Sequence, residues 1–113
     1  MKKVLENVGN VWQGGAHVRI YLDRAAINKL LGLKVEVYNT GRISAAWLDG
    51  EKISNSSADL MITATDKVYY DVVAEKFVVK LDWGSPSTRK YGEQLEAEFN
   101  SLTVEEVSKK LGI

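Results

Sequence analysis

The chain has 113 residues, of which 45% are hydrophobic and 27% charged, and its 15 basic side chains balance its 15 acidic ones. This length allows one domain with one core, and the composition is that of an ordinary globular protein. Zero net charge disfavours an electrostatic nucleic-acid binder, which usually carries a basic excess. The absence of cysteine excludes disulfides and thiolate metal ligands.

The expected location follows from the apolar segments. The first residues are basic, but they lack the apolar run of about 7–15 residues that a signal peptide contains. No stretch approaches the roughly 20 apolar residues that a membrane span needs. We therefore expect a cytoplasmic protein that does not enter a membrane.

The first third of the chain predicts a hairpin followed by a short helix. Val4 to Gln13 and Val18 to Leu22 have the character of strands, and Gly14-Gly15-Ala16 between them is a hairpin signal. Asp23 is a credible N-cap of a helix, and Gly32 stands where a glycine terminates one.

The next segment predicts a second hairpin. Strands over Lys34 to Tyr38 and Ile43 to Leu48 flank the turn residues Asn39-Thr40-Gly41, and Asp49-Gly50 forms another turn. The serine-rich residues that follow predict a helix over about 56–65, because serine side chains cap free helical amides. The alternation points Val35 and Val37 inward and places Ile43, Ala45 and Trp47 on one face.

The last third predicts a hairpin and two helices. Apolar residues alternate along Val68 to Val73 and along Phe77 to Leu81, which predicts two paired strands. The only proline, Pro86, lies in a stretch that begins at Trp83, and this stretch predicts a linker over 84–90. Thr103 with Glu106 is a capping-box pattern that opens a terminal helix. The helix before it has an apolar stripe of Tyr91, Leu95, Phe99 and Leu102.

These elements predict an α+β domain with a mostly antiparallel sheet of about six strands, short helices and a C-terminal helical pair. Tight hairpins favour antiparallel pairing because parallel strands need long crossovers. We expect one domain over residues 1–113, divided into a β-rich body over 1–83, a linker over 84–90 and a helical tail over 91–113.

Candidate binding residues combine aromatic, guanidinium and amide groups. Residues 38–58 gather a tryptophan, an arginine and many hydroxyl and amide side chains beside a hairpin signal. Such groups stack on a base and bond to its edge, although the tryptophans also suit a core. The predicted ligand-binding residues are Arg19, Tyr21, Arg42, Ser44, Trp47, Asn55 and Ser56.

A second candidate is an anion site at the start of the predicted tail helix. Free amides and hydroxyls there would hold an anion, and two basic side chains would add charge. The alternative is that the hydroxyls only cap the helix. The residues concerned are Ser87, Thr88, Arg89 and Lys90.

The sequence lacks the residue patterns that usually carry catalysis or bind a metal. His17 is the only histidine, and no strand-turn nucleophile motif is present. The glutamates at 93, 96 and 98 fit the solvated face of an amphipathic helix. We expect no catalytic residue, no metal and no cofactor.

Two resemblances bear on function. Ser101 to Ile113 resembles the first helix and turn of excisionase-type DNA-binding domains, but the recognition helix that reads the major groove is missing. The short, cysteine-free, near-neutral chain resembles small accessory proteins of phages and mobile elements, some of which block host defence enzymes or sequester nucleotide signals.

The resulting hypothesis is a small non-enzymatic binding protein of this anti-defence type, which recognises a protein or a nucleotide-like ligand. Exposed edge strands also predict a homodimer. One alternative is a nucleic-acid-binding module that uses Arg19, Arg42, Arg89 and Lys90. Another is a small hydrolase or transferase.

Overall fold

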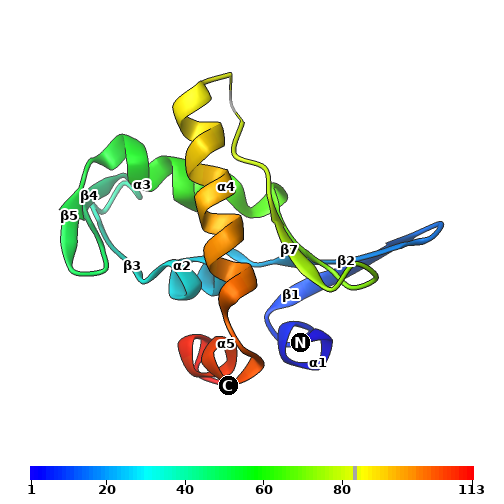
Figure 1. Ribbon diagram of the computed structural model, residues 1–113. Coiled ribbons are helices and arrows are strands. Elements are labelled where there is room, and N and C mark those ends of the chain that lie inside the picture. The colour runs from blue at the N-terminus through cyan, green and yellow to red at the C-terminus, as the bar shows by residue number, and fades with distance from the viewer. Residues whose placement is uncertain (83) are drawn as a thin grey trace.

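The computed structural model describes residues 1–82 and 84–113. These residues form seven strands in two antiparallel sheets, with most of the helices between the sheets, so the predicted α+β class is confirmed (Figure 1). The elements in chain order are α1 (Lys2–Leu5), β1 (Gly9–Gly14), β2 (His17–Leu22), α2 (Arg24–Leu31), β3 (Leu33–Val37), β4 (Ile43–Leu48), β5 (Glu51–Ile53), α3 (Asn55–Ile62), the 3-10 helix η1 (Thr63–Asp66), β6 (Val68–Asp71), β7 (Lys76–Val79), α4 (Pro86–Ser101) and α5 (Val104–Leu111).

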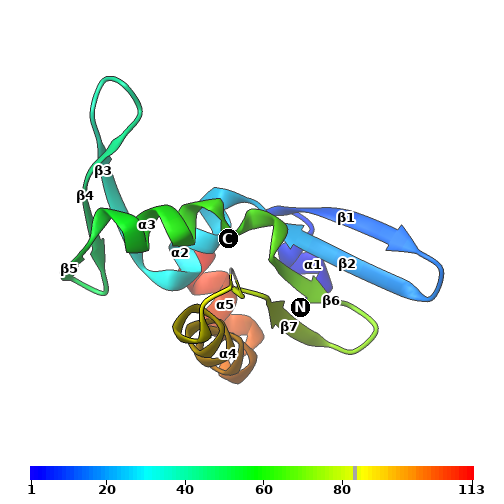
Figure 2. The same cartoon turned by 90° about the horizontal axis from the view of Figure 1, so that it is seen from above.

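The larger sheet has the strand order β1-β2-β6-β7, with every neighbouring pair antiparallel. The β1–β2 hairpin turns through Gly15 and Ala16, where Gly15 has a positive φ of 58°. This hairpin extends away from the body of the molecule (Figure 2). Both of its strands were predicted, but the expected start of the first strand at Val4 is wrong.

The N-terminal residues form the short helix α1 instead of a strand. Leu5 is completely buried, and Val4 and Val8 pack against the core from positions one helical turn apart. Lys2 and Glu6 form a salt bridge of 3.6 Å on the outer side. Val4 and Leu5 are adjacent and both pack inward, which a helix allows and the alternation of a strand does not.

The smaller sheet has the order β3-β4-β5, and its third strand, of only three residues, was not predicted. A register shift pairs Glu36 with Ala45 and Val37 with Ile43, so Ser44 has no partner across the sheet. This bulge breaks the expected alternation. Val37 is 60% exposed rather than inward, and the fully buried residue of β4 is Ala46.

Local capping signals set the helix ends as predicted. The Asp23 carboxylate accepts a hydrogen bond of 2.8 Å from the amide of Ala26, and Gly32 ends α2 with a φ of 72°. The Ser54 hydroxyl accepts from the amide of Ser57 at the start of α3. The capping box that opens α5 is complete, with two bonds of 3.1 Å between Thr103 and Glu106.

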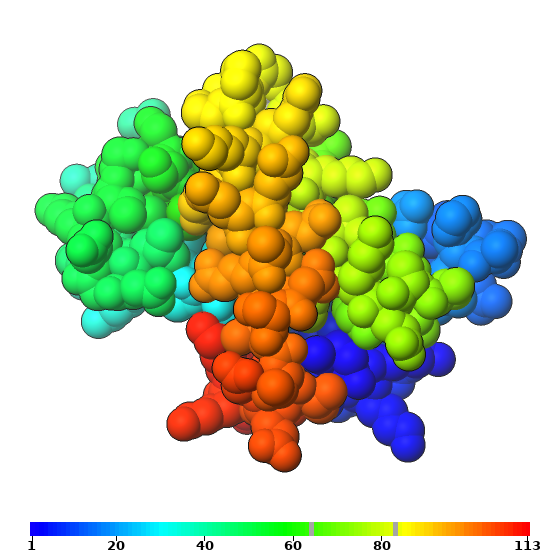
Figure 3. Space-filling model, viewed as in Figure 1, coloured from blue at the N-terminus to red at the C-terminus, as the bar shows by residue number. Residues whose placement is uncertain are grey.

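The long helix α4 begins at Pro86, so residues 86–90 of the expected linker form its first turns. Trp83, expected at the start of the linker, lies outside the described residues. Figure 3 shows α4 running between the side that carries β3, β4 and β5 and the side that carries the larger sheet. Leu95 and Phe99 of its predicted stripe are buried, and Tyr91 and Leu102 pack against the core.

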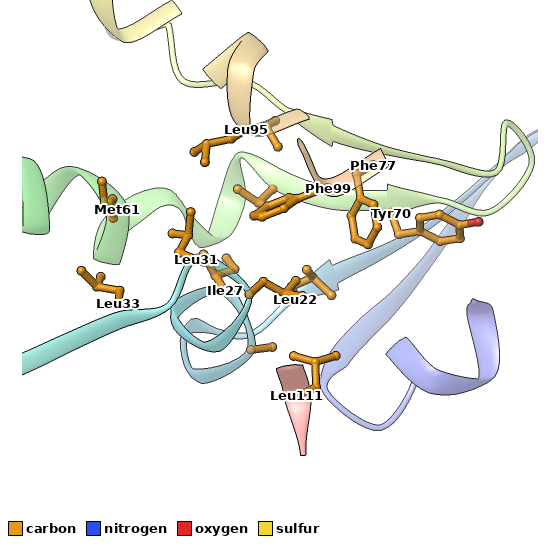
Figure 4. Close-up of a cluster of buried hydrophobic side chains, with 14 of the residues drawn as sticks. Leu22, Ile27, Leu31, Leu33, Met61, Tyr70, Phe77, Leu95, Phe99 and Leu111 are labelled. Atoms are coloured by element: carbon orange, nitrogen blue, oxygen red, sulfur yellow. The ribbon is translucent and has the colours of Figure 1, made fainter. Parts of the chain in front are cut away.

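The core lies where the larger sheet, α2, α4 and α5 meet (Figure 4). Phe77 is central: its ring centroid lies 5.1 Å from that of Tyr70 and 5.6 Å from that of Phe99. Val107 and Leu111 of α5 are buried in the same cluster. No described helix combines the length and apolar character that crossing a bilayer demands.

Candidate functional site

The outer face of the larger sheet gathers aromatic side chains around one arginine. Arg19 lies opposite Trp12 on β1 and opposite Asp71 on β6, and Tyr21 lies opposite Tyr69. Directly opposed residues of antiparallel strands project from the same face. Ile20, between Arg19 and Tyr21, is fully buried on the other face.

These side chains hold the Arg19 guanidinium in place. Its central carbon lies 5.3 Å from the centroid of the Trp12 ring and 4.7 Å from that of the Tyr69 ring. Its Nη1 donates a 3.2 Å hydrogen bond to the Tyr21 hydroxyl, and the Tyr21 and Tyr69 rings lie 5.1 Å apart. We call Trp12, Arg19, Tyr21 and Tyr69 the arginine cluster.

The positive charge of the cluster is not neutralised by a salt bridge. Within residues 1–82 and 84–113, Arg19 forms no ion pair, and its buried Nε has no hydrogen-bond partner. The hydrogen bond to Tyr21 raises the pKa of Arg19, burial opposes this, and the negative charge of Asp71 adds a smaller increase. Arg19 is therefore cationic at every physiological pH.

A hollow of about 770 Å³, open to solvent, adjoins the cluster at Tyr21. Asp23 lies on its wall but is engaged as the N-cap of α2. The other polar side chains on its wall are those of Asn10, Arg24, Thr65 and Asp66, and the Asp66 carboxylate lies 4.0 Å from the Lys67 ammonium. The full lining is Asn10, Tyr21, Leu22, Asp23, Arg24, Thr65 and Asp66.

A second group of predicted residues lies at the β3–β4 hairpin. Arg42 and Asn55 line one hollow of about 270 Å³ together with Tyr38 and Asp59. Asn55 also has a structural role, because its Nδ2 donates a 3.1 Å hydrogen bond to the carbonyl of Ile43. This bond ties the start of α3 to β4.

The other predicted residues of this region do not line that hollow. Trp47 is half-buried, and the Lys34 ammonium lies 5.9 Å from its ring centroid. Ser44 lies at the bulge of β4, and Ser56 is exposed on α3. The sequence predicted one surface here, whereas the lining of the hollow includes only Arg42 and Asn55 of the predicted set.

Three of the four candidate anion-binding residues line two different hollows. Ser87 and Thr88 line one between α3 and α4, whereas Arg89 lines another with Lys80 and Asp82. The hydroxyls also bond locally: that of Thr88 donates to the carbonyl of Ser85 at 2.8 Å, and Ser87 and Ser85 share a hydrogen bond of the same length. Lys90 is exposed and lines neither hollow.

The residues that could serve catalysis or bind a metal lie apart from one another. His17 is exposed at the beginning of β2, opposite Gly14. In the part of the chain that the structure describes, no three His, Asp or Glu side chains are placed to hold a metal ion.

Two residues of the arginine cluster were missing from the predicted site. Neither Trp12 nor Tyr69 was among the predicted ligand-binding residues. The alternation of Val68 to Asp71 places Tyr69 opposite the buried face, which was the available signal. Its proximity to Arg19 depends on the β2–β6 pairing, which no local pattern reveals. Comparisons of the chain with protein-family models, curated proteins and solved structures found no match.

Proposed function

We propose that this chain is a small non-enzymatic binding protein that recognises a nucleotide-like ligand at the arginine cluster and its adjoining hollow. One observation carries the proposal. A guanidinium that forms no salt bridge within the described residues lies between the rings of Trp12 and Tyr69, on the sheet face opposite the buried Ile20.

The chemistry of the cluster suits a base joined to a phosphate. Trp12 is 46% exposed and offers an aromatic surface, and stacking of a base on such a ring contributes about 1–3 kcal/mol. Arg19 supplies a positive charge that attracts phosphate oxygens. Asn10, on the wall of the hollow, offers both a donor and an acceptor to a base edge.

The balance of charge favours a small ligand over a long nucleic acid. A local cation is sufficient for one or two phosphates, whereas nucleic-acid binding draws on many basic contacts. The chain has zero net charge. Moreover, Arg42 and Arg89, which the nucleic-acid alternative would use with Arg19, line separate hollows, and the lining of neither includes Arg19.

The biological role that fits this binding mode is sequestration. A protein that captures a nucleotide-like signal silences a host system that depends on the signal, as some accessory proteins of phages and mobile elements do. The sequence resemblance to such proteins supports this part of the proposal.

A second candidate function is binding to a protein through the β3–β4 hairpin. Val37 and Tyr38 are 60% and 61% exposed at its end, which projects from the body (Figure 2). Exposed apolar groups of this size are typical of interaction sites when they are contiguous. Replacing both with serine would abolish such binding and leave the arginine cluster intact.

Calorimetric titration with AMP, GMP and a short single-stranded oligonucleotide tests the nucleotide proposal. Trp12→Ala and Arg19→Ala should each weaken binding at least about tenfold, or ~1.4 kcal/mol. The matched controls are Trp47→Ala and Arg42→Ala, which remove the same side-chain types elsewhere and should change affinity less than about twofold. Circular dichroism would verify that each variant is folded.

The outcomes separate the competing interpretations. Binding of the oligonucleotide alone, with a steep dependence on salt, would favour the nucleic-acid alternative. If the wild-type protein binds none of the three probes, the nucleotide proposal is wrong. Equal losses in Trp12→Ala and Trp47→Ala would show that the site is misplaced.

A further inference from the structure

The two edges of the larger sheet differ in how their backbone groups are satisfied. At the β7 edge, the Glu96 carboxylate accepts a 2.9 Å hydrogen bond from the amide of Val79, and Asn100 bonds to the backbone of Phe77. At the β1 edge, no described residue other than those of β2 bonds to the backbone of Gly9–Gly14. Figure 2 shows β1 as the outermost strand with an open side.

The hairpin geometry determines which groups of β1 face outward. Gly14 and His17 close a two-residue turn, and the closing pair of such a turn exchanges hydrogen bonds. Bonded and non-bonded pairs then alternate along the strands, so Trp12 and Asn10 also bond to β2. The backbone N–H and C=O groups of Gly9, Val11 and Gln13 therefore face the open side.

We propose that a second copy of this chain occupies this edge through antiparallel pairing of β1 with β1 of the partner. A two-fold axis at Val11 places it opposite Val11 of the partner subunit and places Gly9 opposite the partner's Gln13. Each outward N–H and C=O group of one β1 strand then faces a partner group on the other β1 strand, which gives about six new hydrogen bonds. The result is a continuous eight-stranded sheet, twice the four strands of one copy.

The residues of β1 offer no obstacle to this pairing. Natural edge strands are protected by charged side chains, proline or bulges, and Gly9–Gly14 contains no charge and no proline and pairs with β2 without a register shift. Val11 and Trp12 are 52% and 46% exposed and project from opposite faces. In the dimer, the two Val11 side chains meet on one face, and each Trp12 lies beside the partner's Asn10 on the other.

This register has a consequence for the hollow beside the arginine cluster. Asn10 lines that hollow, so Trp12 of the partner subunit would stand at its rim and add an aromatic wall. The two arginine clusters would lie on the same face of the extended sheet. The pairing itself is independent of the ligand, and only this consequence rests on the proposed function.

Cysteine cross-linking tests the register, since the chain contains no cysteine of its own. Opposed residues of a hydrogen-bonded antiparallel pair have Cα atoms about 5.5 Å apart, within the range of a disulfide. Under mild oxidation, Val11→Cys should form a covalent dimer. The matched control is Val73→Cys, which replaces a valine that is 66% exposed outside the edge strand and should stay monomeric on a non-reducing gel.

Light scattering tests the assembly without cross-links. The wild-type protein should have a mass near twice the 12.6 kDa of one chain. Val11→Lys and Val11→Glu should each be monomeric, because like charges would face each other across the axis. Mixing the two variants should restore a dimer, which a misfolded variant could not do. Val73→Lys should remain dimeric.

The proposal is overturned if the wild-type protein is monomeric at all concentrations. It is also overturned if Val11→Lys remains dimeric, if Val73→Cys cross-links as well as Val11→Cys, or if the mixed charge variants stay apart. None of these measurements involves a nucleotide, so their failure is distinct from a failure of the proposed function.

Discussion

Asn100 on α4 exchanges two hydrogen bonds with the backbone of Phe77 on β7. The amide of Phe77 donates to Asn100 Oδ1 at 2.6 Å, and Asn100 Nδ2 donates to the carbonyl of Phe77 at 3.1 Å. A side-chain amide thus takes the place of the next strand and joins the helix to the sheet.

We expect Asn100→Ala to lower the free energy of unfolding by about 1–3 kcal/mol, because two hydrogen bonds of typical strength are lost. Helix propensity alone would change stability in the opposite direction, since alanine is the better helix former. Urea denaturation measures the difference. The control is Gln94→Ala, which removes an exposed amide from the same helix and should change stability little. Equal stability of Asn100→Ala and the wild-type protein would show that the two hydrogen bonds contribute nothing.

Phe99→Ala should be among the most destabilising single changes in α4. The ring is 1% exposed and lies edge-on to Phe77. Removing it leaves a cavity in the core, which typically costs about 3–5 kcal/mol. Thermal denaturation measures the loss, with Val104→Ala as the control because Val104 is 45% exposed. An unchanged melting temperature would mean that α4 is only loosely attached.

Alanine variants of Asn55 and Arg42 test whether these residues stabilise the fold or bind the ligand. Asn55 donates to the carbonyl of Ile43, so Asn55→Ala should lower stability by about 1 kcal/mol. Arg42 is exposed and makes no salt bridge among the described residues, so Arg42→Ala should leave stability within about 0.5 kcal/mol. Under the proposal that the ligand binds at the arginine cluster, both variants should keep nucleotide affinity, and calorimetry would detect a loss.

Signals that depend on a few neighbouring residues predicted much of the secondary structure. The cap at Asp23, the terminating glycine at Gly32 and the Thr103–Glu106 capping box act within one helical turn, so the sequence alone reveals them. The hairpin at Gly15 is equally local. The wrong start of the first strand arose because Val4 and Val8 fit a helix as well as a strand in so short a segment.

Features that depend on distant pairing could not be predicted. Tyr69 meets Arg19 only because β6 pairs with β2 across some 50 residues of chain, as the register from Tyr21 to Tyr69 shows. The bulge opposite Val37 likewise changed which residues of β4 are buried. The sequence therefore revealed that Arg19 and Tyr21 share a face, but not which aromatic rings complete the cluster.

Alkaline pH should destabilise the protein through two tyrosines. Burial raises the pKa of Tyr70 and of Tyr91 above the ordinary value of 10.0. Carboxylates act in the same direction: Asp71 and Glu75 near Tyr70, and Asp49 and Glu98 near Tyr91. The folded protein thus holds these protons more tightly than the unfolded chain does.

The sign of the pH effect follows from proton linkage. The stability due to the raised pKa is fully present below about pH 10 and is lost as pH rises from there through the pKa of the folded state. Urea unfolding at several alkaline pH values should therefore show a steeper loss for the wild-type protein than for Tyr70→Phe combined with Tyr91→Phe. Parallel curves would contradict the expectation, because lysines titrate equally in both proteins.

Gly92 is buried in the middle of α4, where the helix passes close to the end of β7. A Cβ at this position would lie 3.1 Å from both the backbone nitrogen and the Cβ of Leu81, and 3.4 Å from the carbonyl oxygen of Val79. Two effects of Gly92→Ala therefore oppose each other. Better helix propensity would stabilise by up to about 1 kcal/mol, whereas crowding in a packed core typically costs about 1–3 kcal/mol.

At Gly92 the cost of crowding should exceed the gain in helix propensity, because two of the three close atoms belong to the backbone and cannot rotate away. We expect Gly92→Ala to lower the free energy of unfolding, by up to about 2 kcal/mol, in urea denaturation. The converse substitution, Ala97→Gly, at an exposed position of the same helix, should cost about 1 kcal/mol through propensity alone. A more stable Gly92→Ala variant would show that α4 can move outward, and that its approach to Leu81 is not fixed by packing.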